Sequence, residues 1–77
     1  MGKIKDDYGN TWTKLNDLTW SNDGYSFVEV QIIRQRNGYT VYLNEEGNVN
    51  TWMFPTKEKA ISFARKIMMK YPSSGGY

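Results

Sequence analysis

Apolar and polar residues alternate through much of residues 18–54, with the period of two that is typical of β-strands whose two faces differ. Two dipeptides within this region, Asp23-Gly24 and Asn37-Gly38, favour tight hairpin turns. A type I′ turn needs positive φ at both central residues, and Asp-Gly and Asn-Gly adopt it readily. A further turn is expected at residues 45–48, with the sequence EEGN. We therefore predict four strands, at residues 18–22, 25–36, 39–44 and 49–54.

The pattern changes to a helical period after Pro55. Apolar residues recur there at spacings that place them on one narrow arc of an α-helix. Thr56 is expected to be the N-cap of this helix, and Pro72 is expected to end it, so that residues 72–77 form a flexible tail. The apolar arc consists of Ala60, Ile61, Ala64, Ile67, Met68 and Tyr71, with Phe63 beside it.

The expected turns decide which strand residues lie opposite one another. A two-residue turn at Asn37-Gly38 pairs Arg34 with Val41, and the turn at residues 45–48 pairs Val41 with Trp52. Since side chains alternate between faces, one face collects large apolar residues that the helix can cover. The predicted fold is α+β, a three- to four-stranded antiparallel meander sheet with one C-terminal α-helix packed on one face. The covered face would contain Val28, Val30, Ile32, Tyr39, Val41, Leu43, Trp52 and Phe54.

Residues 1–17 show no clear hydrophobic period. They nevertheless contain Tyr8, Trp12 and Leu15, and large apolar side chains in a small protein need cover. We expect an ordered N-terminal arm here, followed by a single domain of sheet and helix at residues 18–71.

Composition narrows the chemistry of the 77-residue chain, which contains neither cysteine nor histidine. Those two residue types supply most general bases, activated nucleophiles and transition-metal ligands, so we expect a protein without catalytic activity, metal or cofactor. A chain without cysteine is more typical of the cytoplasm than of secreted small domains. No apolar run approaches the roughly 18 residues that a membrane span needs, and the first residues lack the apolar centre of a signal peptide. We expect a cytoplasmic protein that does not act on membranes.

The net charge of +2 is unevenly distributed. Residues 1–30 carry three basic and five acidic side chains, whereas residues 31–77 carry seven basic and three acidic ones. Nucleic-acid-binding proteins usually show a denser basic face than this. The charge pattern therefore favours a protein partner over a nucleic acid.

The predicted face away from the helix mixes apolar side chains with amides and hydroxyls. Ile33, Tyr42 and Met53 give this face an apolar centre, and apolar patches with a polar rim are typical of interaction sites. The expected turn at Asp23-Gly24 adds two aromatic residues. We predict a partner-binding site formed by Gln31, Ile33, Gln35, Thr40, Tyr42, Met53, Trp20 and Phe27.

Two alternatives would use the same face differently. The N-terminal arm could fold over it through Tyr8, Trp12 and Leu15. A second copy of the chain could also pack on it, which would make the protein a self-associating structural subunit.

Basic residues outside this face define an alternative nucleic-acid site. Arg34 and Arg36 could grip phosphates, although the expected register puts both on the helix side, where they could also stack on Tyr39. Lys57 and Lys59 lie in the first turn of the predicted helix, where cations do not complement the helix dipole. The alternative site consists of Arg34, Arg36, Asn44, Lys57 and Lys59.

The stretch RNGYTVYLNEEGNVNTWMFPTKEKAISFARKI, residues 36–67, resembles small β-β-β-α modules in its turns, its tryptophan and its helix cap. It is similar to the ethylene-response-type DNA-binding domain of plants and to the N-terminal arm-binding domains of integrases. It also resembles short uncharacterised bacterial and phage proteins that end in a strand, a Thr cap and a similar helix.

The resemblance to DNA-binding modules implies that the sheet face away from the helix would lie in the major groove. In this chain that face would offer Gln31, Gln35, Thr40, Tyr42 and Asn44, without an arginine to contact phosphates. We therefore expect a small binding module that contacts a protein, with DNA binding as the alternative. A short chain rich in lysine and asparagine, without catalytic residues, is typical of a phage or mobile-element accessory protein that acts on a host protein.

Overall fold

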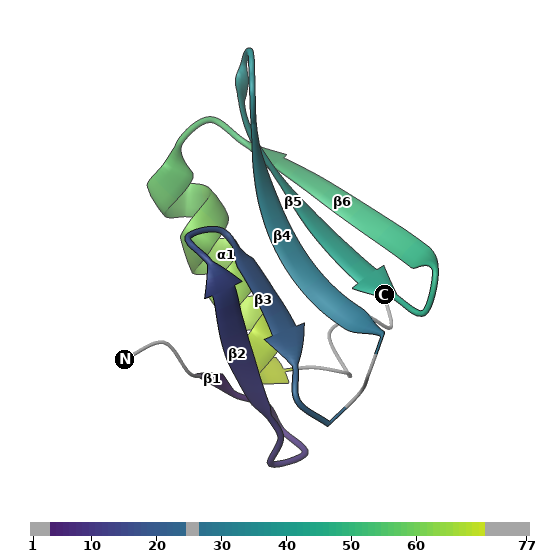
Figure 1. Ribbon diagram of the computed structural model, residues 1–77. Helices are drawn as coiled ribbons and strands as arrows, with labels where there is room; N and C mark the ends of the chain where they lie inside the picture. The colour runs from purple at the N-terminus through teal and green to yellow at the C-terminus, as the bar shows by residue number, and fades with distance from the viewer. Residues whose placement is uncertain (1–3, 25–26, 71–77) are drawn as a thin grey trace.

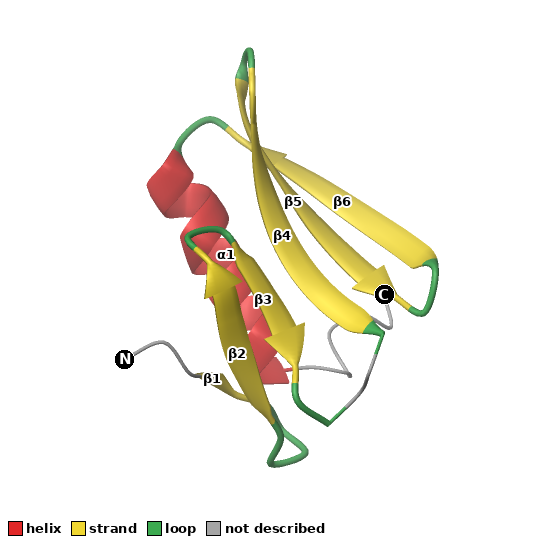
Figure 2. Ribbon diagram, in the orientation of Figure 1, coloured by secondary structure: helices red, strands yellow, loops and turns green. Residues whose placement is uncertain are grey.

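A six-stranded antiparallel sheet and one C-terminal helix make up the fold in a computed structural model that describes residues 4–24 and 27–70. The strands follow one another in the sheet in chain order, and the sheet curves around the helix, which lies against one of its faces (Figure 1; Figure 2). The predicted α+β class is thus confirmed, with more strands than expected. The elements are β1 (Ile4–Lys5), β2 (Thr11–Asn16), β3 (Thr19–Asn22), β4 (Val28–Gln35), β5 (Gly38–Glu45), β6 (Asn48–Phe54) and α1 (Lys57–Lys70).

The additional strands come from the segment that was expected to be an arm. β1 pairs with β2, and β2 pairs with β3, so the segment extends the sheet beyond β3. The turn between β1 and β2 is organised by Asp6, whose Oδ1 accepts hydrogen bonds from the N–H groups of Tyr8 and Asn10 at 2.9 Å each. Its Oδ2 accepts from the side-chain amide of Asn22 at 3.0 Å, which ties the turn to β3. A buried carboxylate with three donors is a stable arrangement.

Trp12 anchors the same segment to the helix. Its side chain is fully buried on the helix side of the sheet, and its indole N–H donates a hydrogen bond of 3.0 Å to the carbonyl oxygen of Met68. The last carbonyl groups of a helix have no partner within the helix, and this bond supplies a donor to one of them. Trp12 therefore joins the first strands of the sheet to the last turn of α1.

The pairing of β5 with β6 follows the predicted register, with Val41 opposite Trp52 and Tyr39 opposite Phe54. The pairing of β4 with β5 differs from the prediction, because Arg34 lies opposite Tyr39 and not Val41. The turn falls at residues 36–37, and Gly38 is already the first residue of β5. Since the register moves by an even number of residues, every side chain keeps its predicted face.

The position of Gly38 explains this difference. Its φ is +150°, and a Cβ built on it would lie 2.2 Å from the carbonyl oxygen of Phe54. Gly38 thus allows β5 to approach the end of β6 closely. The sequence pattern predicts that Gly38 is needed as a central residue of the turn, whereas it is the first residue of β5.

The hairpin between β3 and β4 was predicted wrongly. Trp20 lies opposite Val30, whereas a two-residue turn at Asp23-Gly24 would have placed it opposite Phe27. Asp23 instead pairs with β2: its N–H donates to the carbonyl of Thr11 at 2.8 Å, and its carboxylate accepts hydrogen bonds from the hydroxyl groups of Thr11 and Thr13. The register changes by an odd number of residues, and Trp20 moves to the helix side of the sheet.

The core lies between α1 and the concave face of the sheet. The predicted apolar face of β4, β5 and β6 is confirmed, and Phe63 of the helix packs against Trp52 and Phe54, with ring centroids 5.0 Å and 4.9 Å apart. Thr56 caps the helix as predicted, because its Oγ1 accepts a hydrogen bond of 3.2 Å from the N–H of Lys59. Tyr71, Pro72 and the tail at residues 72–77 lie outside the described residues. The buried core consists of Trp12, Trp20, Val28, Val30, Ile32, Val41, Leu43, Ala60, Ala64, Ile67 and Met68.

Trp12→Phe should lower the free energy of unfolding by about 2–4 kcal/mol, because it removes buried volume and leaves the carbonyl of Met68 without its donor. Urea denaturation followed by circular dichroism measures this loss. Leu15→Ala on the same strand is the control, since Leu15 is exposed and its loss should change stability by less than about 0.5 kcal/mol. Equal effects of the two changes would mean that β2 is not held by Trp12.

Gly38→Ala should lower the free energy of unfolding by more than about 2 kcal/mol, since backbone strain adds to the collision with Phe54. Gly47→Ala is a matched control, because Gly47 also has positive φ (+95°) but nothing within 4 Å of an added Cβ. It should cost only the conformational strain, about 1–2 kcal/mol. The same denaturation experiment compares them, and equal losses would contradict the close approach of β5 to β6.

Candidate protein-binding face

We define the open face as the surface of β4, β5 and β6 that points away from α1. Cross-strand pairing orders its side chains into rows. Ile33 lies opposite Thr40, and Thr40 lies opposite Met53; in the next row Tyr42 stands between Gln31 and Thr51. The face consists of Glu29, Gln31, Ile33, Gln35, Thr40, Tyr42, Asn44, Val49, Thr51 and Met53.

The apolar side chains of the open face are accessible to solvent. Met53 is 66% exposed and Ile33 is 37% exposed, and Tyr42 in the next row is half-buried. Gln31 and Gln35 are exposed beside them. The predicted centre of Ile33, Tyr42 and Met53 therefore lies together on one surface, although Ile33 and Tyr42 are diagonal neighbours and not a directly opposed pair.

Thr40 belongs to the open face but contributes little surface, because it is only 4% exposed. Its hydroxyl donates a hydrogen bond to the side-chain carbonyl of Gln35. Thr40 is thus placed to orient Gln35 and not to contact a partner directly.

The two aromatic residues expected beside this face, Trp20 and Phe27, differ in their exposure. Trp20 is 5% exposed and lies on the helix side, so its inclusion in the binding site was wrong. The cause is the odd shift of the β3–β4 register described above. Phe27 is 75% exposed and stands at the end of the open face where β4 begins.

Residues 4–17, the described part of the N-terminal segment, do not cover the open face. β1 and β2 continue the sheet on the far side of β3, and Trp12 is buried against the helix. Tyr8 and Leu15 are exposed and lie in the turn after β1 and in β2. The alternative in which these three residues pack over the open face is therefore wrong.

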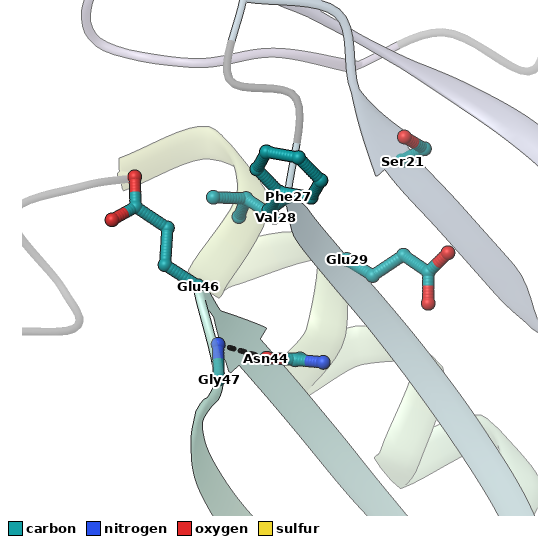
Figure 3. A pocket seen from close by; sticks show the side chains of 7 residues that line it. All are labelled: Ser21, Phe27, Val28, Glu29, Asn44, Glu46 and Gly47. Carbon is teal, nitrogen blue, oxygen red and sulfur yellow. Dashed lines mark hydrogen bonds between the residues drawn. The ribbon is translucent and has the colours of Figure 1, made fainter.

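A pocket of about 500 Å³ lies at the Phe27 end of the open face (Figure 3). It lies between β3, the start of β4 and the turn from β5 to β6. A hydrogen bond of 3.0 Å from the N–H of Glu46 to the carbonyl of Phe27 joins the residue before β4 to that turn. Figure 3 shows the carboxylates of Glu29 and Glu46 pointing apart, which is not the geometry of a catalytic pair. The pocket is lined by Ser21, Phe27, Val28, Glu29, Asn44, Glu46 and Gly47.

Sequence reasoning did not find this pocket. Its walls meet because the β4–β5 register places Val28 opposite Glu45 and so brings Phe27 to the turn at Glu46, while the β3–β4 register places Ser21 opposite Glu29. Within residues 4–24 and 27–70, no group of three or more His, Cys, Asp or Glu side chains is placed to hold a metal ion.

The residues of the alternative nucleic-acid site are not brought onto one face. Arg34 lies on the helix side of β4, Arg36 lies in the following turn, and Lys57 and Lys59 lie in the first turn of α1. All four are exposed at the end of the molecule where β4 ends and α1 begins (Figure 1). Asn44 lies apart from them on the open face, where its Oδ1 accepts a hydrogen bond of 3.0 Å from the N–H of Gly47.

Comparison with known proteins found no match for this chain among protein-family models, curated proteins or solved structures. The resemblance of residues 36–67 to β-β-β-α modules therefore remains a prediction. Within the described part of the chain, α1 falls short of the length and apolarity that crossing a membrane would require.

Proposed function

We propose that this protein is a non-catalytic module that binds a partner protein through its open face. The observation that carries the proposal is the accessible apolar centre of Ile33, Tyr42 and Met53 on a sheet whose other face carries the buried core. Accessible apolar side chains with a polar rim are typical of interaction sites, and aromatic residues and Met are enriched at their centres.

The construction of the face also supports binding. Its backbone is already paired in the sheet through eight residue pairs between β4 and β5 and seven between β5 and β6. Such a surface is ordered before a partner arrives, so association costs little conformational entropy. Gln31 and Gln35 at the rim can donate and accept hydrogen bonds that fix the orientation of the partner.

The DNA-binding alternative has less support. β4, β5 and β6 place no basic residue on the open face, while Glu29 is part of it. Phosphate contacts supply much of the affinity for DNA, and a face of this kind would repel phosphates. The basic residues at the start of α1 belong to a different surface.

The proposed setting is the cytoplasm of a host cell, where an accessory protein of a phage or mobile element would meet its target. The composition supports this, since the chain lacks cysteine and is short.

The double change Ile33→Lys with Met53→Lys should reduce partner binding at least tenfold, because it places two charges in an apolar interface. Tagged full-length protein is used to capture partners from the source cells by cross-linking, and each recovered partner is then titrated against wild type and variant. Leu15→Lys is the matched control, since the exposure of Leu15 lies between those of Ile33 and Met53 but Leu15 lies on β2.

The control should bind as wild type does, and circular dichroism should show that both variants are folded. If the double variant binds every partner with unchanged affinity, or if Leu15→Lys weakens binding as much, the open face is not the binding site.

A further inference from the structure

β6 is an edge strand that lacks the features that usually protect an edge from pairing. Among the described residues no strand lies beside its outer edge. Natural edge strands are commonly shortened, charged, bulged or interrupted by proline. β6 has seven residues, NVNTWMF, without a charge or a proline, and pairs with β5 through seven consecutive positions without a bulge.

The turn before β6 decides which backbone groups are free. Glu46 and Gly47 have φ of 54° and 95°, the signature of a two-residue type I′ turn. In such a hairpin the flanking residues, Glu45 and Asn48, form a hydrogen-bonded pair, and bonded and non-bonded pairs then alternate. The N–H and C=O groups of Val49, Thr51 and Met53 therefore point away from β5, toward the open edge.

We propose that β6 pairs in antiparallel fashion with β6 of a second copy of this chain, around a two-fold axis at Thr51. This is the register in which all seven residues of the strand find a partner. Thr51 then lies opposite Thr51 of the second copy, and Val49 lies opposite Met53. The three residues with free backbone groups face one another, so each edge supplies the donors and acceptors that the other lacks.

The side chains fit this register as well. Val49 and Met53 are 54% and 66% exposed on the open face, and the two-fold axis makes each the direct neighbour of the other. Apolar and Thr–Thr cross-strand pairs stabilise sheets. The strand offers no charge by which an acidic or basic partner would be selected, and no like charges oppose one another when two identical strands meet. These features favour a second copy over a different protein as the occupant.

The proposed pairing uses the backbone edge of β6, whereas the partner-binding proposal uses the surface of the sheet, and the side chain of Met53 takes part in both. The two six-stranded sheets would become continuous, and the open faces of both copies would lie on the same side. A dimer of this kind could hold a partner at two places.

Sedimentation equilibrium of the full chain across a wide concentration range tests the proposal, with an expected rise from 9.0 kDa toward twice that mass. Thr51→Lys and Thr51→Glu each place like charges opposite one another at the axis and should weaken dimerisation at least tenfold. An equimolar mixture of the two variants should restore the dimer, because opposite charges then meet. Thr51 is exposed, so both variants should fold.

Gln31→Lys is the matched control, since Gln31 lies on the open face in the same row as Thr51 but two strands from the edge. It should dimerise as wild type does. Amide exchange adds a specific readout: Val49, Thr51 and Met53 should gain protection as concentration rises, whereas Asn50 and Trp52 should be protected at all concentrations.

A chain that stays monomeric at millimolar concentration would overturn the proposal. So would a dimer that Gln31→Lys breaks and the Thr51 variants do not, because that dimer would form through the open face. Capture of a different protein by β6 of a monomeric chain, in a manner sensitive to Thr51→Lys, would show that the edge is used by another occupant. None of these outcomes depends on whether the Ile33 and Met53 variants lose a partner.

Discussion

The structure depends on the contact between one helix and one face of the sheet. Ala60 and Ala64 are fully buried in this contact, and their small side chains let α1 lie close to the strands. A single helix covers a single face, so the alternation of side chains along each strand divides the residues into a buried set and a solvent set. The open face is a consequence of this division.

The N-terminal strands close the same core from the other end. Trp12 brings a large ring and a hydrogen-bond donor to the last turn of α1, and Asp6 fixes the turn that precedes it. Small domains bury a low fraction of their surface, and this chain has no disulfide to compensate. Because the N-terminal residues form β1 and β2 and do not cover the open face, they enlarge the buried core on the helix side and leave the other side accessible.

The sequence predicted those parts of the fold whose signals are local. The cap at Thr56 and the register of β5 with β6 follow from residues close in the chain. The register of β4 with β5 differs from the prediction by an even number of residues, so each side chain still lies on its predicted face of the sheet. The β3–β4 hairpin could not be predicted in this way, because Asp23 takes part in contacts with Thr11 and Thr13 that no local pattern reveals. That one error placed Trp20 in the candidate site, whereas the structure places it in the core.

The central claim is that one face of the sheet is buried and the other is free. Pairs of residues of the same type provide the sharpest test, since Ile32 is buried and Ile33 is accessible, while Met68 is buried and Met53 is accessible. The measurement is relaxation of methyl signals by a soluble paramagnetic agent in NMR of the full chain. The signals of Ile33 and Met53 should broaden strongly while those of Ile32 and Met68 persist. Equal broadening within each pair, or protection of Ile33 and Met53 in the dilute monomer, would contradict the division on which the proposed binding face rests.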